Sequence, residues 1–325
     1  TSLQPQANHS MTARIIMKMR VADIVDDSAE VKVFTLRHPL RDELPVASPG
    51  SHVDVHLLDG KIRQYSLCGD PDEKSQYKIA VKREPGGRGG SRLMHEAYVR
   101  GSEIHVSAPR NNFPLEPTAD RHILVAGGIG ITPFISMAHH LSRQGAEFEL
   151  HYASRQYPPP LMASLLDICG SRLNIYSSNS ERPRRFDPKG ALSNQPPGTH
   201  IYACGPQALM DAVSAATSEW PSQQVHFEAF QATLDENFKA EPFDIRIAST
   251  GSTIRVPADQ SALCVLRDAG FLLPASCEMG VCGSCECGYR DGSVIHRDKV
   301  LKIDARQDRM MLCVSRARVS VTLDL

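Results

Sequence analysis

Three cysteines with the spacing C-x4-C-x2-C constrain this chain more than any other feature. They are Cys277, Cys282 and Cys285, and Cys313 follows further along the chain. A cluster of two irons and two sulfides needs four thiolates that converge from several sides, and this spacing is that of plant-type [2Fe–2S] loops. The loop therefore predicts a [2Fe–2S] site with these four cysteines as its ligands.

Two glycines inside the loop suit a chain that wraps a cluster closely. Gly280 and Gly283 can adopt positive φ angles where a Cβ atom would clash, so that backbone N–H groups point at the sulfides. The fourth ligand must come from elsewhere in the fold, and we expect Cys313 to be a buried strand residue.

Other uses of these cysteines remain open at this point. A structural zinc site would more naturally use two C-x2-C pairs, and only one is present. Disulfides are disfavoured by the odd number of cysteines, nine, in a chain of 325 residues. Cys287 could replace a neighbouring ligand, although the spacing is satisfied without it. Cys169 and Cys264 are expected to be small buried apolar residues.

The first region, about residues 11–115, predicts an antiparallel β-barrel or sandwich. Apolar and polar residues alternate with a period of two, and glycine- or proline-containing turns separate the runs. The expected strand segments are 31–33, 53–57, 77–81 and 104–106.

The second region, about residues 116–230, predicts a mostly parallel sheet covered by helices on both faces. Short apolar strand segments alternate with helical segments, which is typical of α/β domains. The expected strands are 122–126, 148–152, 173–176 and 201–203, and the expected helices are 134–141, 161–168 and 208–216.

A polar linker, residues 231–242, leads to the cysteine-bearing third region, residues 243–325. This region predicts strands at 243–248, 253–256 and 319–323, and a helix at 262–269. The whole is a three-domain chain.

A glycine turn at residues 126–133 (AGGIGITP) joins a predicted strand to a predicted helix. Thr132 suits the N-cap and Pro133 the first helical position, and a helix start of this kind can bind a pyrophosphate. The turn departs from G-x-G-x-x-G, so a purely structural turn remains an alternative. A second turn, Cys204-Gly205-Pro206, would lie at the carboxyl end of a neighbouring strand, where open α/β sheets bind ligands.

Two segments of the first region could bind a phosphorylated aromatic cofactor. Residues 63–66 (RQYS) offer an arginine for phosphate and a tyrosine for stacking, and residues 88–91 (RGGS) offer backbone N–H groups and a hydroxyl. Taken singly, Tyr65 could be a core residue, Arg63 a surface residue, and Lys82 with Arg83 a solvent-exposed pair.

The charge balance excludes two classes of partner. Lys and Arg number 36 and Asp and Glu 37, so the chain has no basic excess for nucleic acid or for a membrane surface. No apolar stretch is long enough to span a bilayer, and the polar start, residues 1–10, does not resemble a secretory signal.

Four motifs, in this order, resemble the phthalate dioxygenase reductase family, which has vanillate demethylase reductases as close relatives. The motifs are RQYS, GGIGITP, CGP and the cysteine loop, and the resemblance covers residues 11–325. It implies an FMN-binding β-barrel, an NAD-binding α/β domain and a plant-type ferredoxin domain of the α+β, β-grasp type.

The resemblance also implies roles for individual residues. Ser66, Cys204 and Phe230 are expected where hydride transfer occurs, with Ser66 near the reactive flavin nitrogen and Phe230 over the flavin ring. Gly89, Gly90 and Ser91 would hold the FMN phosphate. Further flavin contacts would be Arg63, Gln64, Tyr65, Ala80, Val81, Lys82 and Thr132. The NAD site would comprise Gly127, Gly128, Gly130, Cys204, Gly205 and Pro206, with Ser154 and Arg155 near the adenosine ribose.

The function implied is that of a reductase component. Electrons would pass from NADH through FMN to the [2Fe–2S] cluster and on to a terminal Rieske non-haem iron oxygenase or demethylase. The family implies a monomer, and the cysteine cluster together with the polar start predicts a cytoplasmic protein. Two alternatives are the same redox chain serving a cytochrome P450 or a generic one-electron acceptor, and a zinc- or cluster-binding sensor on a degenerate reductase scaffold.

Overall fold

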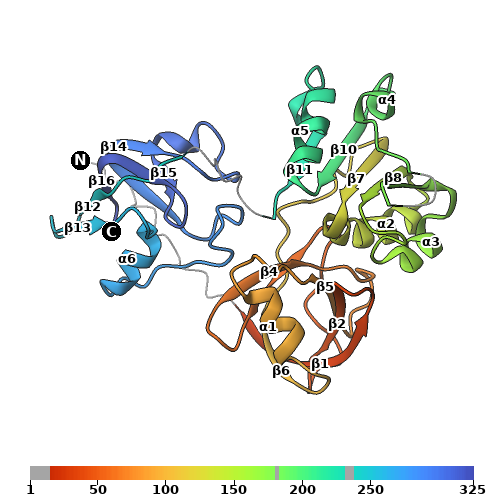
Figure 1. The fold of residues 1–325 in the computed structure, drawn as a ribbon, viewed down its shortest axis with the longest axis horizontal. Coiled ribbons are helices and arrows are strands. Elements are labelled where there is room, and N and C mark those ends of the chain that lie inside the picture. Colours follow the sequence, from red (N-terminus) through yellow and green to blue (C-terminus); the bar gives the residue numbers. More distant parts are fainter. Residues whose placement is uncertain (1–14, 180–182, 231–237) are drawn as a thin grey trace, which may run out of the picture.

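Three β-sheets follow one another along the chain (Figure 1). The structure, a computed structural model, describes residues 15–179, 183–230 and 238–325. The linker prediction falls largely on residues 231–237, which lie outside the described residues. Within the described ranges, no helix has the length and apolar character needed to cross a membrane.

The first sheet is a six-stranded antiparallel barrel with the strand order β4-β3-β6-β1-β2-β5. A bridge between Leu67 and Ile79 brings its two outer strands together. The alternating apolar residues line its core, as the sequence predicts. The elements are β1 (Ile16–Asp26), β2 (Val31–Arg37), β3 (His52–His56), β4 (Ile62–Ser66), β5 (Tyr77–Lys82), α1 (Gly90–Ala97) and β6 (Glu103–Ser107).

The second sheet has five parallel strands in the order β11-β10-β7-β8-β9. Its elements are β7 (Arg121–Gly127), η1 (Gly128–Ile131), α2 (Thr132–Gln144), β8 (Glu147–Ser154), α3 (Met162–Cys169), η2 (Gly170–Arg172), β9 (Leu173–Ser177), α4 (Pro188–Leu192), β10 (Thr199–Cys204), α5 (Gln207–Ala216), η3 (Ser222–Gln224) and β11 (Val225–Glu228). The chain runs outward from β7 in one direction and returns to the other side at β10. The ends of β7 and β10 therefore form the crevice where such sheets bind ligands.

Helices cover both faces of this parallel sheet, which confirms the prediction. Helices α2 and α3 pack on one face and α4 and α5 on the other (Figure 1). Each face has its own core: Phe134 and Leu165 lie in one, and Leu192 and Val213 in the other.

The third sheet has the order β13-β12-β16-β14-β15, with β12 and β16 parallel and the other pairs antiparallel. Helix α6 packs on it through Leu263 and Leu266. Cys264 lies on the exposed side of α6, so the expectation that it is buried was wrong. The elements are β12 (Phe243–Ile247), β13 (Thr253–Val256), α6 (Ala262–Asp268), β14 (Glu286–Ile295), η4 (Ala305–Gln307), β15 (Arg309–Met311) and β16 (Arg316–Leu323).

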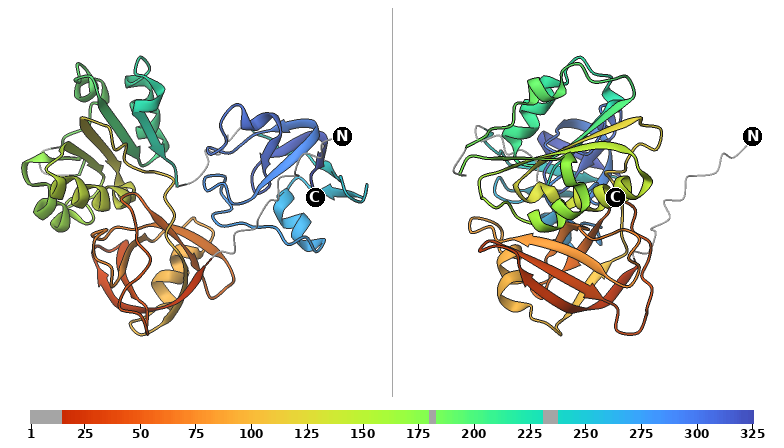
Figure 2. Two further views of the ribbon diagram at one scale, coloured as in Figure 1. Left: turned by 180° about the vertical axis from the view of Figure 1, so that it is seen from behind. Right: turned by 90° about the vertical axis from the view of Figure 1, so that its right-hand side faces the viewer.

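The barrel contacts both other domains. Apolar residues of the barrel, among them Ala80 and Phe113, share a core with helix α2, and Arg143 on α2 pairs with Asp70 and Asp72. Seen from behind, the cysteine-bearing domain lies beside the barrel (Figure 2).

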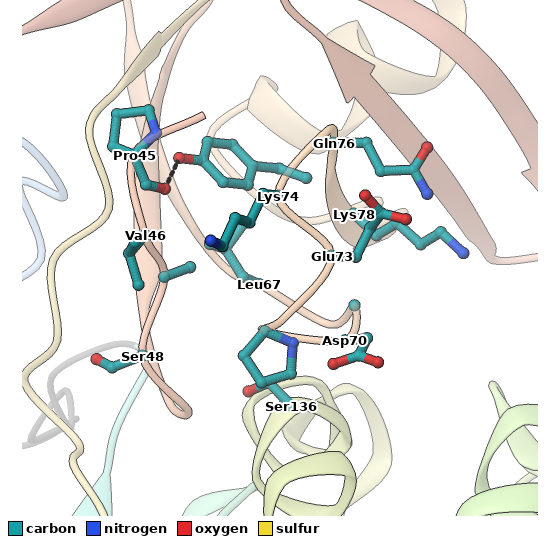
Figure 3. A pocket seen from close by; sticks show the side chains of 14 residues that line it. Pro45, Val46, Ser48, Leu67, Asp70, Glu73, Lys74, Gln76, Lys78 and Ser136 are labelled. Atoms are coloured by element: carbon teal, nitrogen blue, oxygen red, sulfur yellow. Dashed lines mark hydrogen bonds between the residues drawn. The ribbon is translucent and has the colours of Figure 1, made fainter. Parts of the chain in front are cut away.

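A small cavity lies between the barrel and α2, with Ser136 on its rim (Figure 3). Its volume is about 20 Å³, which is room for about one water molecule. Tyr77 and Pro45 both line it, and the Tyr77 hydroxyl donates to the Pro45 carbonyl oxygen at 2.5 Å. This cavity is therefore too small for a flavin or a nicotinamide.

Candidate functional site

A positively charged corner forms where β4 meets the start of helix α1. The Arg63 side chain lies over Gly90, where an added Cβ would come within 2.7 Å of its Nε atom. Burial and the nearby charge of Arg88 lower the pKa of Arg63. Two guanidinium groups beside a helix N-terminus fit a phosphate, which would neutralise their repulsion.

The loop before α1 is held in a conformation that keeps backbone open at this corner. Gly89 has a φ of +85°, and nothing lies within 4 Å of the position that its Cβ would take. The Ser91 hydroxyl accepts a hydrogen bond from the Glu84 N–H at 3.1 Å and closes the loop.

Strand β4 presents alternate residues to different surroundings. Tyr65 packs against the barrel core, whereas the Gln64 amide is 3.5 Å from a carboxylate oxygen of Asp54 on β3. Ser66 is buried and lies at the end of the strand that faces the nucleotide domain.

Three neighbouring residues of β5, Ala80, Val81 and Lys82, were predicted to contact the flavin, and their side chains lie in different surroundings. Ala80 lies in the core shared with the nucleotide domain. The Val81 side chain lies in the barrel core, and its carbonyl oxygen is 2.8 Å from Nε2 of His95. Lys82 is half-buried and pairs with Glu84 at 2.9 Å. Val81 could therefore contact a cofactor only through its backbone.

Residues from three distant segments meet between the barrel and the nucleotide domain. The Ser66 hydroxyl donates to Glu228 Oε2 at 3.4 Å, and Cys204 Sγ lies 4.0 Å from the same oxygen. Burial raises the pKa of Glu228 to about 8 and the pKa of the Cys204 thiol well above its usual range. At neutral pH this junction therefore holds a protonated carboxyl group and a neutral thiol.

The two predicted glycine turns are in direct backbone contact. A Cβ on Gly130 would come within 2.4 Å of the Cys204 carbonyl oxygen, and one on Gly205 within 2.9 Å of Gly127 Cα. A Cβ on Gly127 would strike Pro206, and Gly128 has a φ of +54°. Glycine is thus required here by the close approach of the turns that follow β7 and β10.

The helix after the first turn begins differently from the prediction. Thr132 is the first residue of α2 and not its N-cap, because the η1 turn extends the helical path and Ile131 takes the N-cap position. The Thr132 hydroxyl donates to the Ile129 carbonyl oxygen at 3.1 Å. Its side chain is buried, so its predicted contact with flavin stays a prediction.

The remaining predicted residues lie at the rim of the crevice. Ser154 ends β8 and accepts a hydrogen bond from the Gln156 N–H at 3.1 Å, while Arg155 is exposed. Phe230 follows Glu228 by two residues and is 36% exposed, which leaves its ring available to an incoming ring system.

The four thiols of the cysteine loop form two pairs. Cys277 interacts with Cys282, and Cys285 with Cys313. A hydrogen bond from the partner thiol lowers the pKa of Cys282 to about 5 and also lowers the pKa of Cys285. A two-iron cluster needs four thiolates, and two pairs match two irons. In the described ranges, no three His, Cys, Asp or Glu side chains come together as a single ion would require.

The loop backbone turns its N–H groups toward these sulfurs. The Met279 N–H is 3.3 Å from Cys277 Sγ, and Gly280 and Gly283 have φ angles of +73° and +75°. Cys313 is half-buried in a turn after β15, so its expected place in a buried strand was wrong. Cys287 instead lies in the core of the third sheet. The residues present therefore fit a [2Fe–2S] cluster.

Two family models match this architecture. Residues 18–114 match the oxidoreductase FAD-binding domain, and residues 245–318 match the 2Fe-2S iron-sulfur cluster binding domain. Phthalate dioxygenase reductase of Burkholderia cepacia is 39% identical over 325 residues, which are 99% of either chain. The chain belongs to the phthalate dioxygenase reductase family. It is therefore an oxidoreductase with flavin and [2Fe–2S] domains.

Two solved structures superimpose on nearly the whole of this chain. A structure of phthalate dioxygenase reductase superimposes with a TM-score of 0.78 at 39% identity, and covers 95% of this chain and 98% of that one. A self-sufficient cytochrome P450 monooxygenase superimposes with a TM-score of 0.81 at 38% identity, over 96% of this chain and 41% of that one. All three domains of the reductase thus have counterparts in known proteins.

Glu228 is the site residue that the sequence analysis missed. It lies in the segment His226-Phe227-Glu228-Ala229-Phe230, from which only Phe230 was predicted to contact the cofactor. The signal was an acidic residue directly after Val225-His226-Phe227, at the end of the short strand β11. Its importance depends on contacts with Ser66 and Cys204, which are distant in sequence.

Replacing Glu228 with Gln is expected to change how stability depends on pH. The pKa of Glu228 is raised from 4.5 to about 8, so between these values the folded reductase binds a proton that the unfolded chain does not. Stability should therefore fall as pH rises through this window, by up to about 5 kcal/mol for a shift of this size, and Glu228→Gln should remove that loss.

Urea unfolding at pH 5 and pH 8.5, followed by fluorescence of the single tryptophan, Trp220, measures this effect. Trp220 packs in the nucleotide domain that carries Glu228. The exposed Glu219, replaced by Gln, is the matched control. Parallel pH dependences for the parent and Glu228→Gln would contradict the assignment.

Proposed function

We propose that this reductase passes electrons from NADH through FMN and its [2Fe–2S] cluster to a terminal Rieske non-haem iron oxygenase or demethylase. One observation carries the proposal. The phosphate-binding corner at Arg63 and the cysteine loop both lie along the β3–β4 edge of one barrel, where Asp54 contacts Ser276 beside Cys277. The two redox sites are therefore neighbours within one chain.

The chain's own residues would orient the reactants and exclude water. Bound flavin accepts an electron pair from NADH, and a [2Fe–2S] cluster carries electrons away one at a time. Gly128, which has no atom within 4 Å of the position that its Cβ would take, leaves the backbone open near the start of α2, where a pyrophosphate would bind. Ser66 and Glu228 hold a hydroxyl and a protonated carboxyl group where the domains meet. Phe230, two residues after Glu228 and partly exposed, would cover the flavin ring.

FMN, and not FAD, is the flavin we propose. Two arginines and a helix N-terminus at one corner suit a terminal phosphate dianion, whereas the equivalent phosphate of FAD is a diester with one charge. Mass spectrometry of the flavin released from purified protein identifies it, and FAD alone would contradict this assignment.

A cytochrome P450 is the second candidate acceptor, supported by the similarity to the reductase part of a self-sufficient monooxygenase. For either acceptor we propose a monomer, as the family resemblance implies. The family also implies NADH as the donor.

Anaerobic addition of NADH tests the proposed function. We expect the flavin absorbance to bleach, the cluster to give the electron paramagnetic resonance signal of its reduced form, and NADPH to act more slowly. Turnover with a Rieske oxygenase, and with a P450 in parallel, separates the two acceptors. If NADH reduced neither centre, the function would be disproved.

A further inference from the structure

A buried ion pair of the barrel reaches across to the cysteine loop. Asp54 on β3 is 1% exposed, and one of its carboxylate oxygens lies 2.6 Å from a terminal nitrogen of Arg110. The other oxygen accepts a hydrogen bond from the hydroxyl of Ser276, which is itself 1% exposed. Ser276 immediately precedes Cys277, so the contact is made at the beginning of the loop.

The same ion pair also touches the far side of the loop. The second terminal nitrogen of Arg110 lies 3.4 Å from the hydroxyl of Ser284. Ser284 lies between Cys282 and Cys285 in the sequence, so this contact is made inside the loop. Asp54 and Arg110 therefore contact the loop on both sides of Cys277 and Cys282, and Cys285 follows Ser284 directly.

A second arginine fixes the peptide after Cys277. Arg88 donates to the Cys277 carbonyl oxygen at 2.8 Å and to the Glu278 carbonyl oxygen at 3.2 Å. Glu278 has a φ of +52°, which a residue with a Cβ adopts only where its surroundings hold it. The barrel thus stabilises a strained part of the loop.

We propose that Asp54 and Arg110 form a docking latch, a pair of positioning residues that keeps the cysteine loop against β3 and so sets the rate of electron transfer from flavin to cluster. The inference deepens the proposed function and rests on it. Charge-assisted hydrogen bonds are strong and directional, and removing one member leaves a buried charge without its partner. The loop would then move away from the barrel while each redox site remained complete.

Two latch variants test this in the holoprotein. Asp54→Asn removes the charge, and Ser276→Ala removes only the hydroxyl on the loop side, so the second stays informative if the first folds poorly. Stopped-flow mixing with NADH should show an unchanged rate of flavin reduction. Cluster reduction by the flavin should slow by about 10-fold or more, since small displacements of reacting groups have large kinetic effects.

Two readouts separate positioning from damage to the cluster. Direct reduction by dithionite should give the parental amount of reduced cluster and an unchanged paramagnetic resonance spectrum. Amide hydrogen exchange of residues 277–285 should be faster in both variants. Two variants of the cysteine-bearing domain are the matched controls. Asp244→Asn breaks an exposed ion pair with Arg255, and Ser252→Ala removes an exposed hydroxyl that hydrogen-bonds to Thr250.

Unchanged flavin-to-cluster transfer in both latch variants would overturn the proposal, as would an altered cluster spectrum that accounts for the slower transfer. Failure of the parent protein to reduce its cluster with NADH would instead disprove the proposed function, so the two failures are distinguishable.

Discussion

Replacing Cys282 with Ala is expected to stop electron delivery to an external one-electron acceptor while leaving reduction of the flavin by NADH intact. Cys282 supplies one sulfur of the Cys277–Cys282 pair, and without it one iron would lose half of its protein ligands. Because Cys282 is not one of the residues that form the flavin corner at Arg63, the two activities should separate. The rate of electron delivery to the external acceptor should fall by about 100-fold or more. Losing a residue that only hydrogen-bonds to a metal ligand has a smaller effect than losing the ligand itself.

Cytochrome c reduction and ferricyanide reduction measure the two activities. Iron analysis should show loss of the cluster, and the flavin content should match the parent. Cys264→Ser is the control, because Cys264 is exposed on α6 and takes no part in the loop. Undiminished cytochrome c reduction by iron-free protein would contradict the assignment of the cluster as the exit for electrons.

Replacing Arg63 with Ala is expected to weaken FMN binding by about 100-fold, which corresponds to roughly 3 kcal/mol for lost charge-assisted hydrogen bonds. The guanidinium group of Arg63 lies over Gly90 at the start of α1, where a phosphate would also meet the helix N-terminus. Riboflavin has the same ring but no phosphate, so its affinity should change little.

Quenching of flavin fluorescence by the apoprotein measures both affinities. Arg83→Ala is the matched control, because Arg83 pairs with Glu96 on the exposed side of the same loop region. Equal losses for FMN and riboflavin would show that Arg63 supports the fold of the barrel and not the phosphate.

Most of the architecture could be predicted from hydrophobic periodicity. The alternating runs became strands of the barrel, and the buried runs became β7, β8, β9 and β10, because each pattern leaves one stable way to bury its apolar face. Helix α1 was missed because Gly90 and Ser91 begin it and only Gly90 and Met94 are buried along its eight residues. A helix of eight residues with two buried positions is too short to be predicted from its apolar residues alone.

Predictions from local sequence were wrong at positions where contacts with distant residues determine the conformation. Thr132 has the chemistry of an N-cap, but the η1 turn before it already supplies helical geometry. Cys313 was placed by analogy with apolar neighbours, yet the loop needs it in a turn that faces Cys285. The cysteine spacing itself was decisive for the cluster because all but one of its ligands are local in sequence.

Strand β16 lies in the centre of the third sheet, and its position determines when this domain can fold during translation. Strands β12 and β14 pair with β16 and not with each other, so the sheet is in two halves until residues 316–323 have been made. The barrel and the parallel sheet have all their strands by Glu228 and can fold on the ribosome earlier. Flavin could thus be loaded during translation, whereas iron and sulfide must await the final strand of their domain.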